Sequence, residues 1–391
     1  MEIIIHRGTH QIGGCVTEIS SGNSKVFIDF GADLPSATPT EPTKLISGLT
    51  VSDDSVSALF FTHYHGDHVG RLNEVCESVP IYMGKTAKAL YQNYARRTQS
   101  EIIGKIDSIF TFSPLDKIRV GDITVTPLMV DHSAFDAYMF IIEADGKRVL
   151  HTGDFRLHGF RGAMTIPMLR EYATDIDCII CESTNLSRED TPIISERELQ
   201  KQIYEIMLEN KYVFVLCSST NIDRIGSFYH ANPHGRLFIC DEYQKSQLEI
   251  VREHHKQHSK FYDFSHVYSY APNLDDLMEK QGFCMMIRQG EQFAKLLERY
   301  KGRSKIIYSM WSGYLKGETR NEQLAEFLNG YELVFKHTSG HASTRDLVKL
   351  YQAVNPKKGF IPIHGEMPEK FSELLPQEKL VLLNNGEKFS I

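Results

Sequence analysis

The sequence predicts a mixed α/β (α+β) fold in which a βα domain is inserted into a β-rich one. Up to about residue 192, short apolar runs separated by turn residues dominate the chain. From about residue 195 to 330, helix-like and strand-like runs alternate, which is typical of a parallel sheet. We therefore expect residues 1–192 and 333–391 to form one domain and residues 193–332 to form the inserted domain.

The first half contains several short strands and one clear helix. The stretches EIIIH, GCVTEIS and KVFIDFG predict three strands, and SGNS between the last two is a hairpin signal. VSALFF predicts a buried strand, and KTAKALYQNYARR predicts a helix over 85–97. ITVTPLMV and YMFIIEADGKRVLHTGDF predict further strands, the second with a hairpin turn at ADGK.

The inserted segment and the end of the chain carry the remaining elements. SERELQKQIYEIMLEN predicts a helix, and YVFVLCSS, RLFICD and KIIYSMW predict strands of the parallel sheet. After them we expect a strand in YELVFKHTSG, a helix in STRDLVKLYQAVN, a strand in GFIPIH and a closing hairpin in KLVLLNNGEKFSI.

Composition narrows the functional class. The chain has 391 residues, is 41% hydrophobic and carries a net charge of −7, which fits a globular protein without a strongly basic surface. Any contact with nucleic acid should therefore be local. No apolar run approaches the roughly 18–20 residues of a membrane span, and MEIIIHRG does not resemble a signal peptide. Seven scattered cysteines indicate reduced thiols, so we expect no membrane partner and a cytoplasmic location.

The stretch THYHGDHVGR is the strongest chemical signal. It places His63, His65, Asp67 and His68 directly after a buried strand. Spacing of two lets the first pair share one metal, while the adjacent second pair points to another. Imidazole and carboxylate ligands favour zinc, with manganese as a poorer match. Two such metals would lie roughly 3.5–4 Å apart and could share a hydroxide. A merely His-rich surface loop is the alternative.

Three further ligand candidates end predicted strands. They are His132 after ITVTPLMVD, Asp154 after RVLHTG and His364 at the end of GFIPIH. A lone histidine at a strand end is usually structural, but the joint placement of these residues favours one shared site. An aspartate is the better bridge because its two oxygens can serve two metals.

These motifs resemble a known family. The H-x-H-x-D-H block, His132, TGDF and Asp29 in FIDFG are similar to the metallo-β-lactamase fold, which implies an αββα sandwich. CEST with Glu182, TSGHAS with His341 and PIHGE with His364 resemble the extra motifs of the β-CASP nucleases, ribonuclease J above all. The resemblance implies a zinc-dependent ribonuclease that cuts single-stranded RNA by exonuclease or endonuclease action.

The resemblance also assigns roles. His63, His65 and His132 would bind one zinc, Asp67, His68 and His364 the other, and Asp154 would bridge them. A hydroxide held between the metals would attack phosphorus. Asp67, Glu182 and His341 form the expected catalytic set, with His341 as general acid oriented by Glu182. Asp29 would support a ligand histidine. Tyr64 stands where relatives often carry a small residue, which would narrow the entrance to the metals.

Two turns are candidate phosphate sites. One contains Ser339, Gly340 and Ser343 ahead of a helix, and ribonuclease J relatives hold a substrate phosphate there. The other is CSSTNIDR, with Ser218, Ser219, Thr220 and Arg224, although this pattern is equally typical of an ordinary helix cap. Trp311 and Tyr314 could stack a base, although core packing is the commoner role for a tryptophan.

Alternatives remain open at this point. A small-molecule hydrolase of the same fold, such as a thioesterase or lactonase, would share the metals but would not need His341 or the inserted domain. A non-enzymatic RNA-binding subunit is a third reading. The ribonuclease J family has a further C-terminal domain that aids dimerisation and that has no counterpart in these 391 residues, so a homodimer stays open.

Overall fold

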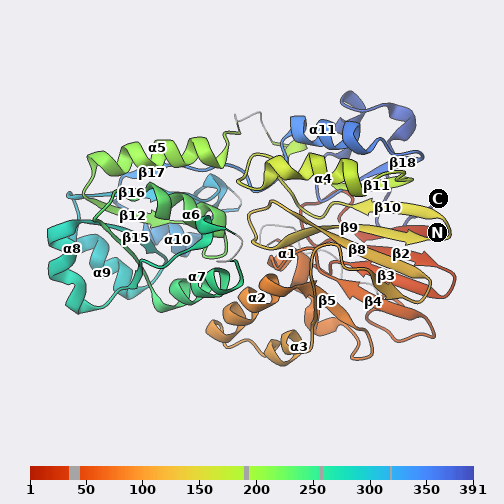
Figure 1. Ribbon diagram of the computed structural model, residues 1–391, viewed down its shortest axis with the longest axis horizontal. Helices are drawn as coiled ribbons and strands as arrows, with labels where there is room; N and C mark the ends of the chain where they lie inside the picture. Colours follow the sequence, from red (N-terminus) through yellow and green to blue (C-terminus); the bar gives the residue numbers. More distant parts are fainter. Residues whose placement is uncertain (35–44, 189–192, 256–258, 318) are drawn as a thin grey trace. The chain divides into compact units, whose positions relative to one another are not determined.

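The computed structural model describes residues 1–34, 45–188, 193–255, 259–317 and 319–391 (Figure 1). They form two compact units, which we call unit 1 (1–192 with 340–391) and unit 2 (193–339). Unit 2 is thus inserted into unit 1. Within the described ranges, none of the helices combines the length and apolar character that crossing a bilayer requires.

Unit 1 is built on two sheets (Figure 1). The first, in the order β19-β1-β2-β3-β4-β5-β6, consists of β1 (Glu2–Arg7), β2 (Val16–Ser21), β3 (Ser24–Ile28), β4 (Val56–Phe60), β5 (Ile81–Gly84), β6 (Phe110–Phe112) and β19 (Lys388–Ser390). The second, in the order β18-β11-β10-β9-β8-β7, consists of β7 (Ile118–Val120), β8 (Ile123–Val130), β9 (Ala137–Ala144), β10 (Lys147–His151), β11 (Cys178–Glu182) and β18 (Gly359–Ile363). The helices of this unit are α1 (Gly66–Val69), α2 (Lys85–Arg97), α3 (Ile103–Asp107), α4 (Thr165–Tyr172) and α11 (Thr344–Val354).

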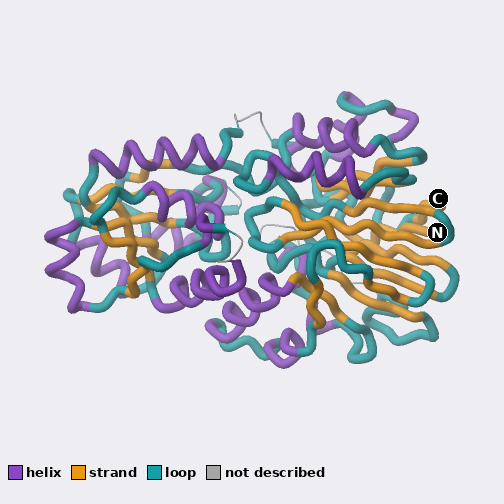
Figure 2. The backbone as a smooth tube through the Cα atoms, viewed as in Figure 1, coloured by secondary structure: helices purple, strands orange, loops and turns teal. Residues whose placement is uncertain are grey.

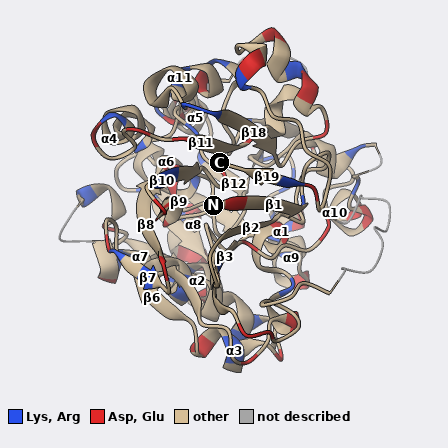
Figure 3. Ribbon diagram, turned by 90° about the vertical axis from the view of Figure 1, so that its right-hand side faces the viewer, with Lys and Arg blue, Asp and Glu red and all other residues tan. Residues whose placement is uncertain are grey.

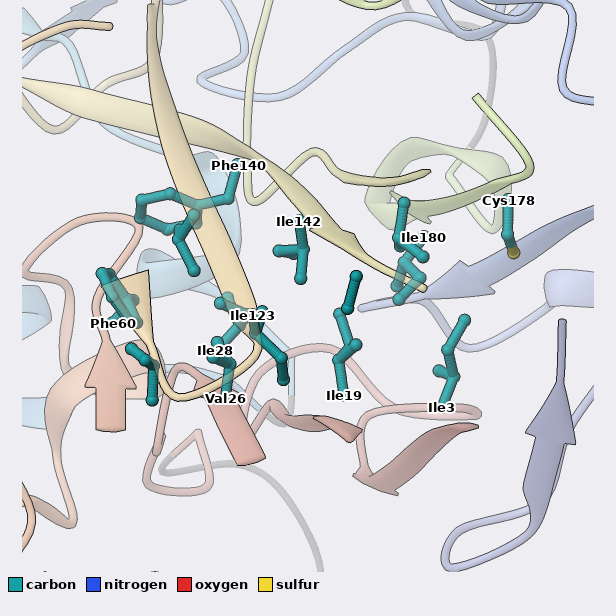
Figure 4. Close-up of a cluster of buried hydrophobic side chains, with 14 of the residues drawn as sticks. Ile3, Ile19, Val26, Ile28, Phe60, Ile123, Phe140, Ile142, Cys178 and Ile180 are labelled. Atoms are coloured by element: carbon teal, nitrogen blue, oxygen red, sulfur yellow. The ribbon is translucent and has the colours of Figure 1, made fainter. Parts of the chain in front are cut away.

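The two sheets pack face to face. Ile3, Ile19 and Val26 of the first sheet meet Ile142 and Ile180 of the second in one buried cluster (Figure 4). A second cluster packs the opposite face of the second sheet against α4 and α11 (Figure 1). Helices α1–α3 lie beside the first sheet (Figure 1). This arrangement confirms the αββα sandwich, because each amphipathic helix buries its apolar stripe on a sheet.

The surface of unit 1 mixes charges. Figure 3 shows acidic and basic positions interspersed along its elements, as on α4 and where β19 lies beside β1. There the Lys388 ammonium lies 3.5 Å from the Glu2 carboxylate. The interspersed signs are consistent with the modest net charge.

Unit 2 contains one six-stranded sheet with helices on both faces (Figure 2). Its strands, in the order β14-β13-β15-β12-β16-β17, are β12 (Tyr212–Leu216), β13 (Leu237–Cys240), β14 (Val267–Ser269), β15 (Phe283–Ile287), β16 (Ser304–Tyr308) and β17 (Leu333–Phe335). Its helices are α5 (Glu196–Glu209), α6 (Ile222–Ala231), α7 (Glu242–His255), α8 (Asp275–Gln281), α9 (Glu291–Arg299) and α10 (Glu322–Phe327). The sequence placed the return of the chain at residue 333. Because β17 pairs with β16, unit 2 extends to Ser339.

Local patterns gave most elements correctly. The helix over 85–97 and the hairpin of β9 and β10 are present as predicted. The prediction of a closing hairpin at the end of the chain is wrong. Strand β19 pairs with β1, and Leu380 forms a bridge with Phe360, so the two halves of this stretch join different sheets. A local pattern of strand residues does not choose its partner.

Candidate metal centre

The loop that follows β4 carries four of the ligand candidates, and the backbone after β3 holds it in place. The Phe30 N–H donates to the carbonyl of His68 at 2.8 Å, and the Ala32 N–H donates to the carbonyl of Gly66 at 3.1 Å. Between them, a Cβ on Gly31 would lie 1.6 Å from the backbone oxygen of Asp67, so only glycine fits. The early strand and the histidine loop are therefore assembled together.

The predicted ligands converge on Asp154, which lies after β10 and is 2% exposed. Its Oδ2 lies 3.1 Å from His68 Nε2. Four more ring nitrogens surround the same oxygen: His341 Nδ1 at 3.6 Å, His364 Nε2 at 3.7 Å, and His63 Nε2 and His132 Nε2 each at 3.9 Å. Residues from five separate segments of the chain thus meet around one carboxylate oxygen.

The separations between donor atoms fit divalent cations. His63 Nε2 lies 3.1 Å and His132 Nε2 lies 3.3 Å from His65 Nδ1. His364 Nε2 lies 3.2 Å from His68 Nε2 and 3.3 Å from Asp67 Oδ2. Around tetrahedral zinc with bonds of roughly 2.0–2.1 Å, neighbouring ligand atoms are about 3.3–3.4 Å apart. Two sets of donors within 4.8 Å of one another match the expected grouping: His63, His65 and His132; and Asp67, His68 and His364. Asp154 joins two further sets, one with His63 and His68 and one with His132 and His341.

Hydrogen bonds on the far side of two rings select the tautomer that a metal needs. His68 Nδ1 lies 2.8 Å from Asp29 Oδ2, and His132 Nδ1 lies 2.7 Å from the carbonyl oxygen of Gly340. Both partners only accept, so Nδ1 carries the hydrogen and Nε2 offers its lone pair to the centre.

Two threonines do the same for two other rings. Thr62 Oγ1 donates to Asp29 Oδ2 at 2.8 Å, so it accepts from His63 Nδ1 at 3.0 Å. Thr184 Oγ1 donates to the carbonyl of His364 at 3.1 Å, so it accepts from His364 Nδ1 at 2.8 Å. The sequence reasoning did not identify either residue. In the sequence, each threonine stands inside a motif that was noted for another residue, Thr62 beside His63 and Thr184 in CEST with Glu182.

The electrostatics of the buried centre also favour bound cations. Burial, and then the nearby imidazoles, hold the pKa of His63 well below its usual value, and burial lowers the pKa of His65 to about 4. Burial would lower the pKa of His68, but Asp154 and Asp29 raise it well above the usual value. Burial likewise opposes ionisation of Asp154, yet the imidazoles hold its pKa well below the ordinary range. Buried carboxylates in this number need positive charge beside them, which divalent cations provide.

The expected acid pair is assembled. His341 Nδ1 lies 3.1 Å from Glu182 Oε2, and Glu182 is 1% exposed. The other carboxylate oxygen accepts from the backbone N–H groups of Phe155 and Ala342, at 3.0 and 3.2 Å. Asn185 holds the carbonyl of His341 at 3.2 Å. The His341 ring is one-fifth exposed, whereas the rings of His63, His68, His132 and His364 are buried, so His341 can meet a substrate.

Among the candidate phosphate residues, Ser343 is a helix cap, Arg224 lies in α6, and the others lie in the segments ahead of α11 and α6. Ser343 caps α11, accepting from the Asp346 N–H at 3.1 Å, and Asp346 closes the capping box. A Cβ on Gly340 would lie 2.6 Å from Ser133 Oγ, which explains the glycine by close packing. In unit 2, Ser218 Oγ lies 3.0 Å from Thr220 Oγ1 ahead of α6, and the Ser219 carbonyl accepts from Gln244 at 3.1 Å. Ser339 is half-buried at the end of unit 2.

Arg224 has a different role from the one expected. It is fully buried and pairs with Glu196, the first residue of α5, through Nη2 at 2.8 Å and Nε at 3.0 Å. Its remaining donors reach Ser309 Oγ at 2.8 Å and the Thr338 carbonyl at 3.0 Å. The guanidinium is committed inside unit 2, so it cannot bind a substrate phosphate as predicted.

Tyr64 does not narrow the entrance either. It is 5% exposed, and its hydroxyl oxygen accepts from the Phe135 N–H at 3.3 Å. The ring therefore packs inward beneath the histidine loop.

Comparisons with known proteins identify two matching domain families and several similar proteins. The β-lactamase superfamily domain matches residues 26–247, and the Zn-dependent metallo-hydrolase RNA specificity domain matches residues 333–380. Similar proteins named ribonuclease J occur in Sinorhizobium meliloti (26% identical, 86% of this chain), Mycoplasma genitalium (22%, 97%) and Mycobacterium tuberculosis (24%, 97%). The chain spans 62% of the length of the first relative and 72% of each of the other two.

A solved structure has the same fold. It is a protein of unknown function from Enterococcus faecalis V583, with a TM-score of 0.79, 21% identity and 99% of each chain covered. The superfamily domain covers more than half of this sequence and contains the histidine loop. The chain therefore belongs to the metallo-β-lactamase superfamily and is similar to its ribonuclease J members.

Proposed function

We propose that this protein is a divalent-metal-dependent phosphodiesterase that hydrolyses single-stranded RNA, with two zinc ions as its metals and manganese as a substitute. The observation that carries the proposal is the convergence of five imidazoles on Asp154, one of which, His341, is paired with Glu182. The RNA specificity domain over 333–380 and the ribonuclease J relatives support RNA as the substrate.

The buried donors would hold the metals in two groups. His63, His65 and His132 face one, Asp67, His68 and His364 face the other, and Asp154 lies between the groups. Divalent cations there lower the pKa of water and neutralise charge that develops on a phosphoryl group. Asp29, Thr62 and Thr184 keep the ring nitrogens pointed at the centre, which removes the entropic cost of orienting them during binding.

His341 supplies the proton for the leaving oxygen. Glu182 accepts from Nδ1, so a protonated His341 ring presents Nε2–H to the departing group. The two backbone N–H groups on Glu182 Oε1 keep this carboxylate oriented toward the ring. Such an acid is needed for an alkoxide leaving group, and it distinguishes a phosphodiesterase from hydrolases whose leaving groups need no proton.

The test is cleavage of labelled single-stranded RNA with zinc or manganese by the intact chain and by His63→Ala and Asp154→Asn variants. We expect both variants to lose cleavage while the circular-dichroism spectrum stays unchanged. His234→Ala, an exposed histidine of unit 2, is the matched control and should retain full activity. Undiminished cleavage by both ligand variants would refute the proposal. Turnover of thioesters or lactones without RNA cleavage would favour the small-molecule alternative.

Comparing linear RNA bearing a 5′-monophosphate or 5′-triphosphate with circular RNA then gives the mode of action. Cleavage of the circle requires endonuclease action, whereas preference for the linear monophosphate indicates an exonuclease that begins at the 5′ end.

A further inference from the structure

Unit 2 carries a group of exposed aromatic side chains that the metal centre does not use. Trp311, Tyr314 and Phe335 are 36%, 45% and 53% exposed. Trp311 precedes η6 (Ser312–Leu315), the turn that follows β16, and Tyr314 lies within it; Phe335 ends the neighbouring strand β17. Core packing, the commoner role for a tryptophan, is therefore not the role of Trp311.

One hollow lies against Phe335 and the turn that carries Trp311 and Tyr314. It has a volume of about 370 Å³ and is lined by Ser312, Leu315, Lys316 and Phe335. The lining is mostly apolar, and its charged member is the exposed Lys316. The volume lies at the low end of pockets for small ligands, so it suits one planar group rather than a folded partner.

The turn is held so that the rings keep their positions. Tyr308 Oη donates to the Trp311 carbonyl at 3.1 Å, and the Asn321 N–H donates to the Tyr314 carbonyl at 2.9 Å. The indole lies against Gly313, where a Cβ would come within 2.4 Å of the ring. The Tyr314 ring stands nearly perpendicular to the indole, with centroids 5.5 Å apart.

The position in the sheet favours a ligand. Both aromatic segments lie at the carboxyl ends of β16 and β17, which run parallel with Tyr308 opposite Phe335. In open parallel sheets, ligands bind outside the carboxyl ends of the strands. Base-stacking rings beside a cation are the elements with which proteins hold single-stranded nucleic acid. Because the whole chain has a net charge of −7, a local cation at the rings matters more.

We propose that Trp311, Tyr314, Phe335 and Lys316 form a subsite that stacks a base of single-stranded RNA and pairs with its phosphate. The proposal deepens the proposed function and rests on it for the identity of the nucleic acid. All four residues belong to unit 2, so this unit would have an RNA-binding site of its own.

Trp311 is the single tryptophan of the chain, so its fluorescence reports on this subsite directly. We would titrate the intact chain with oligoadenylate in the presence of a metal chelator, which prevents cleavage. Polyphosphate of matched charge serves as a probe without bases. We expect oligoadenylate to quench the fluorescence and polyphosphate to leave it unchanged. No quenching, or equal quenching by both probes, would overturn the proposal.

Variants then locate the site. Phe335→Ser should weaken oligoadenylate binding on the order of ten-fold, the effect of losing one stacked base. Gly313→Ala should weaken it as well, because the added methyl displaces the indole. Tyr268→Ser removes a 41% exposed ring from β14, the opposite edge strand, and should not change binding. Labelled-RNA anisotropy gives the same comparison for Trp311→Ala, and a retained affinity there would contradict the proposal.

Two further readouts separate the possible failures. If Phe335→Ser changes the mass in solution but not RNA binding, the hollow is an interface between copies and the subsite is refuted. Hydrolysis of bis-(p-nitrophenyl) phosphate with zinc tests the metal centre alone. Loss of that activity in the intact chain would refute the proposed function while the fluorescence result still decides the subsite.

Discussion

Replacing Thr184 with valine should weaken one metal site selectively. Valine keeps the shape of threonine but removes the hydroxyl that accepts from His364 Nδ1 at 2.8 Å and donates to the His364 carbonyl at 3.1 Å. The ring, 1% exposed, is then left with a buried N–H without its partner, or turns to the tautomer that places hydrogen on the metal-facing Nε2. Either outcome costs about 1–3 kcal/mol.

That free energy corresponds to roughly a 10- to 100-fold loss of metal affinity, the usual effect of removing such a partner. The loss should fall on the group of Asp67, His68 and His364, and the His63 group should keep its metal. We would measure zinc bound per chain during competition with a chelator of graded concentration. We expect the Thr184→Val variant to release its zinc in two steps, the first at a lower chelator concentration than the unaltered protein requires.

Two controls make this result specific. Thr184→Ser restores the hydroxyl and should restore the affinity. Thr126→Val has the same change of side chain at a buried position in β8, where the hydroxyl has no hydrogen-bond partner among the described residues. It should leave zinc binding unchanged and stability equal or higher. Equal zinc retention by Thr184→Val and the unaltered protein would refute the assignment of Thr184.

Three further predictions concern other buried groups. Arg224→Met leaves the Glu196 carboxylate buried and unpaired, so the free energy of unfolding in urea should fall by about 3–5 kcal/mol. Adding Glu196→Gln to this variant should recover part of the lost stability. Additive losses from the two substitutions would argue against the pair. His341→Gln should slow RNA cleavage by about 10²- to 10⁴-fold with zinc content unchanged, and loss of zinc would make His341 a ligand instead of an acid. Burial lowers the pKa of His151 to about 4 in the folded chain, so the unfolded chain takes up its proton first and stability should fall as the pH drops from about 6.5 to about 4, by up to about 3 kcal/mol. Urea unfolding at several pH values, with and without His151→Gln, checks this; an equal pH dependence in both proteins would contradict it.

Short-range patterns carried much of the fold. The helix over 85–97 follows from its 3.6-residue apolar period, and the β9–β10 turn follows from Asp-Gly between two apolar runs. The ligand candidates could be found because each follows a strand whose carboxyl end reaches the same edge of the sandwich. Because β3 and β4 are parallel neighbours, the residues that follow these two strands lie close together.

Other features depended on partners that are distant in the sequence. Arg224 and Glu196 are 28 residues apart in the sequence. The residues around Arg224 predict a helix start, but they do not determine whether its guanidinium faces solvent or a buried carboxylate. A tryptophan such as Trp311 is more often packed in a core, yet the turn after β16 places this one at the surface.

By itself, the sequence determined the fold class, the strand ends and the residue types of the metal centre, because these follow from local periodicity and from donor chemistry. Only the tertiary structure decided which nitrogen of each ring faces the centre, which threonine holds it, and where β19 pairs. Thr184 and His364 are 180 residues apart, and a hydrogen bond at 2.8 Å exists between them only because β11 and β18 are neighbours in one sheet. The physical reason is that hydrogen bonds act over a few ångströms in space, whatever the separation along the chain.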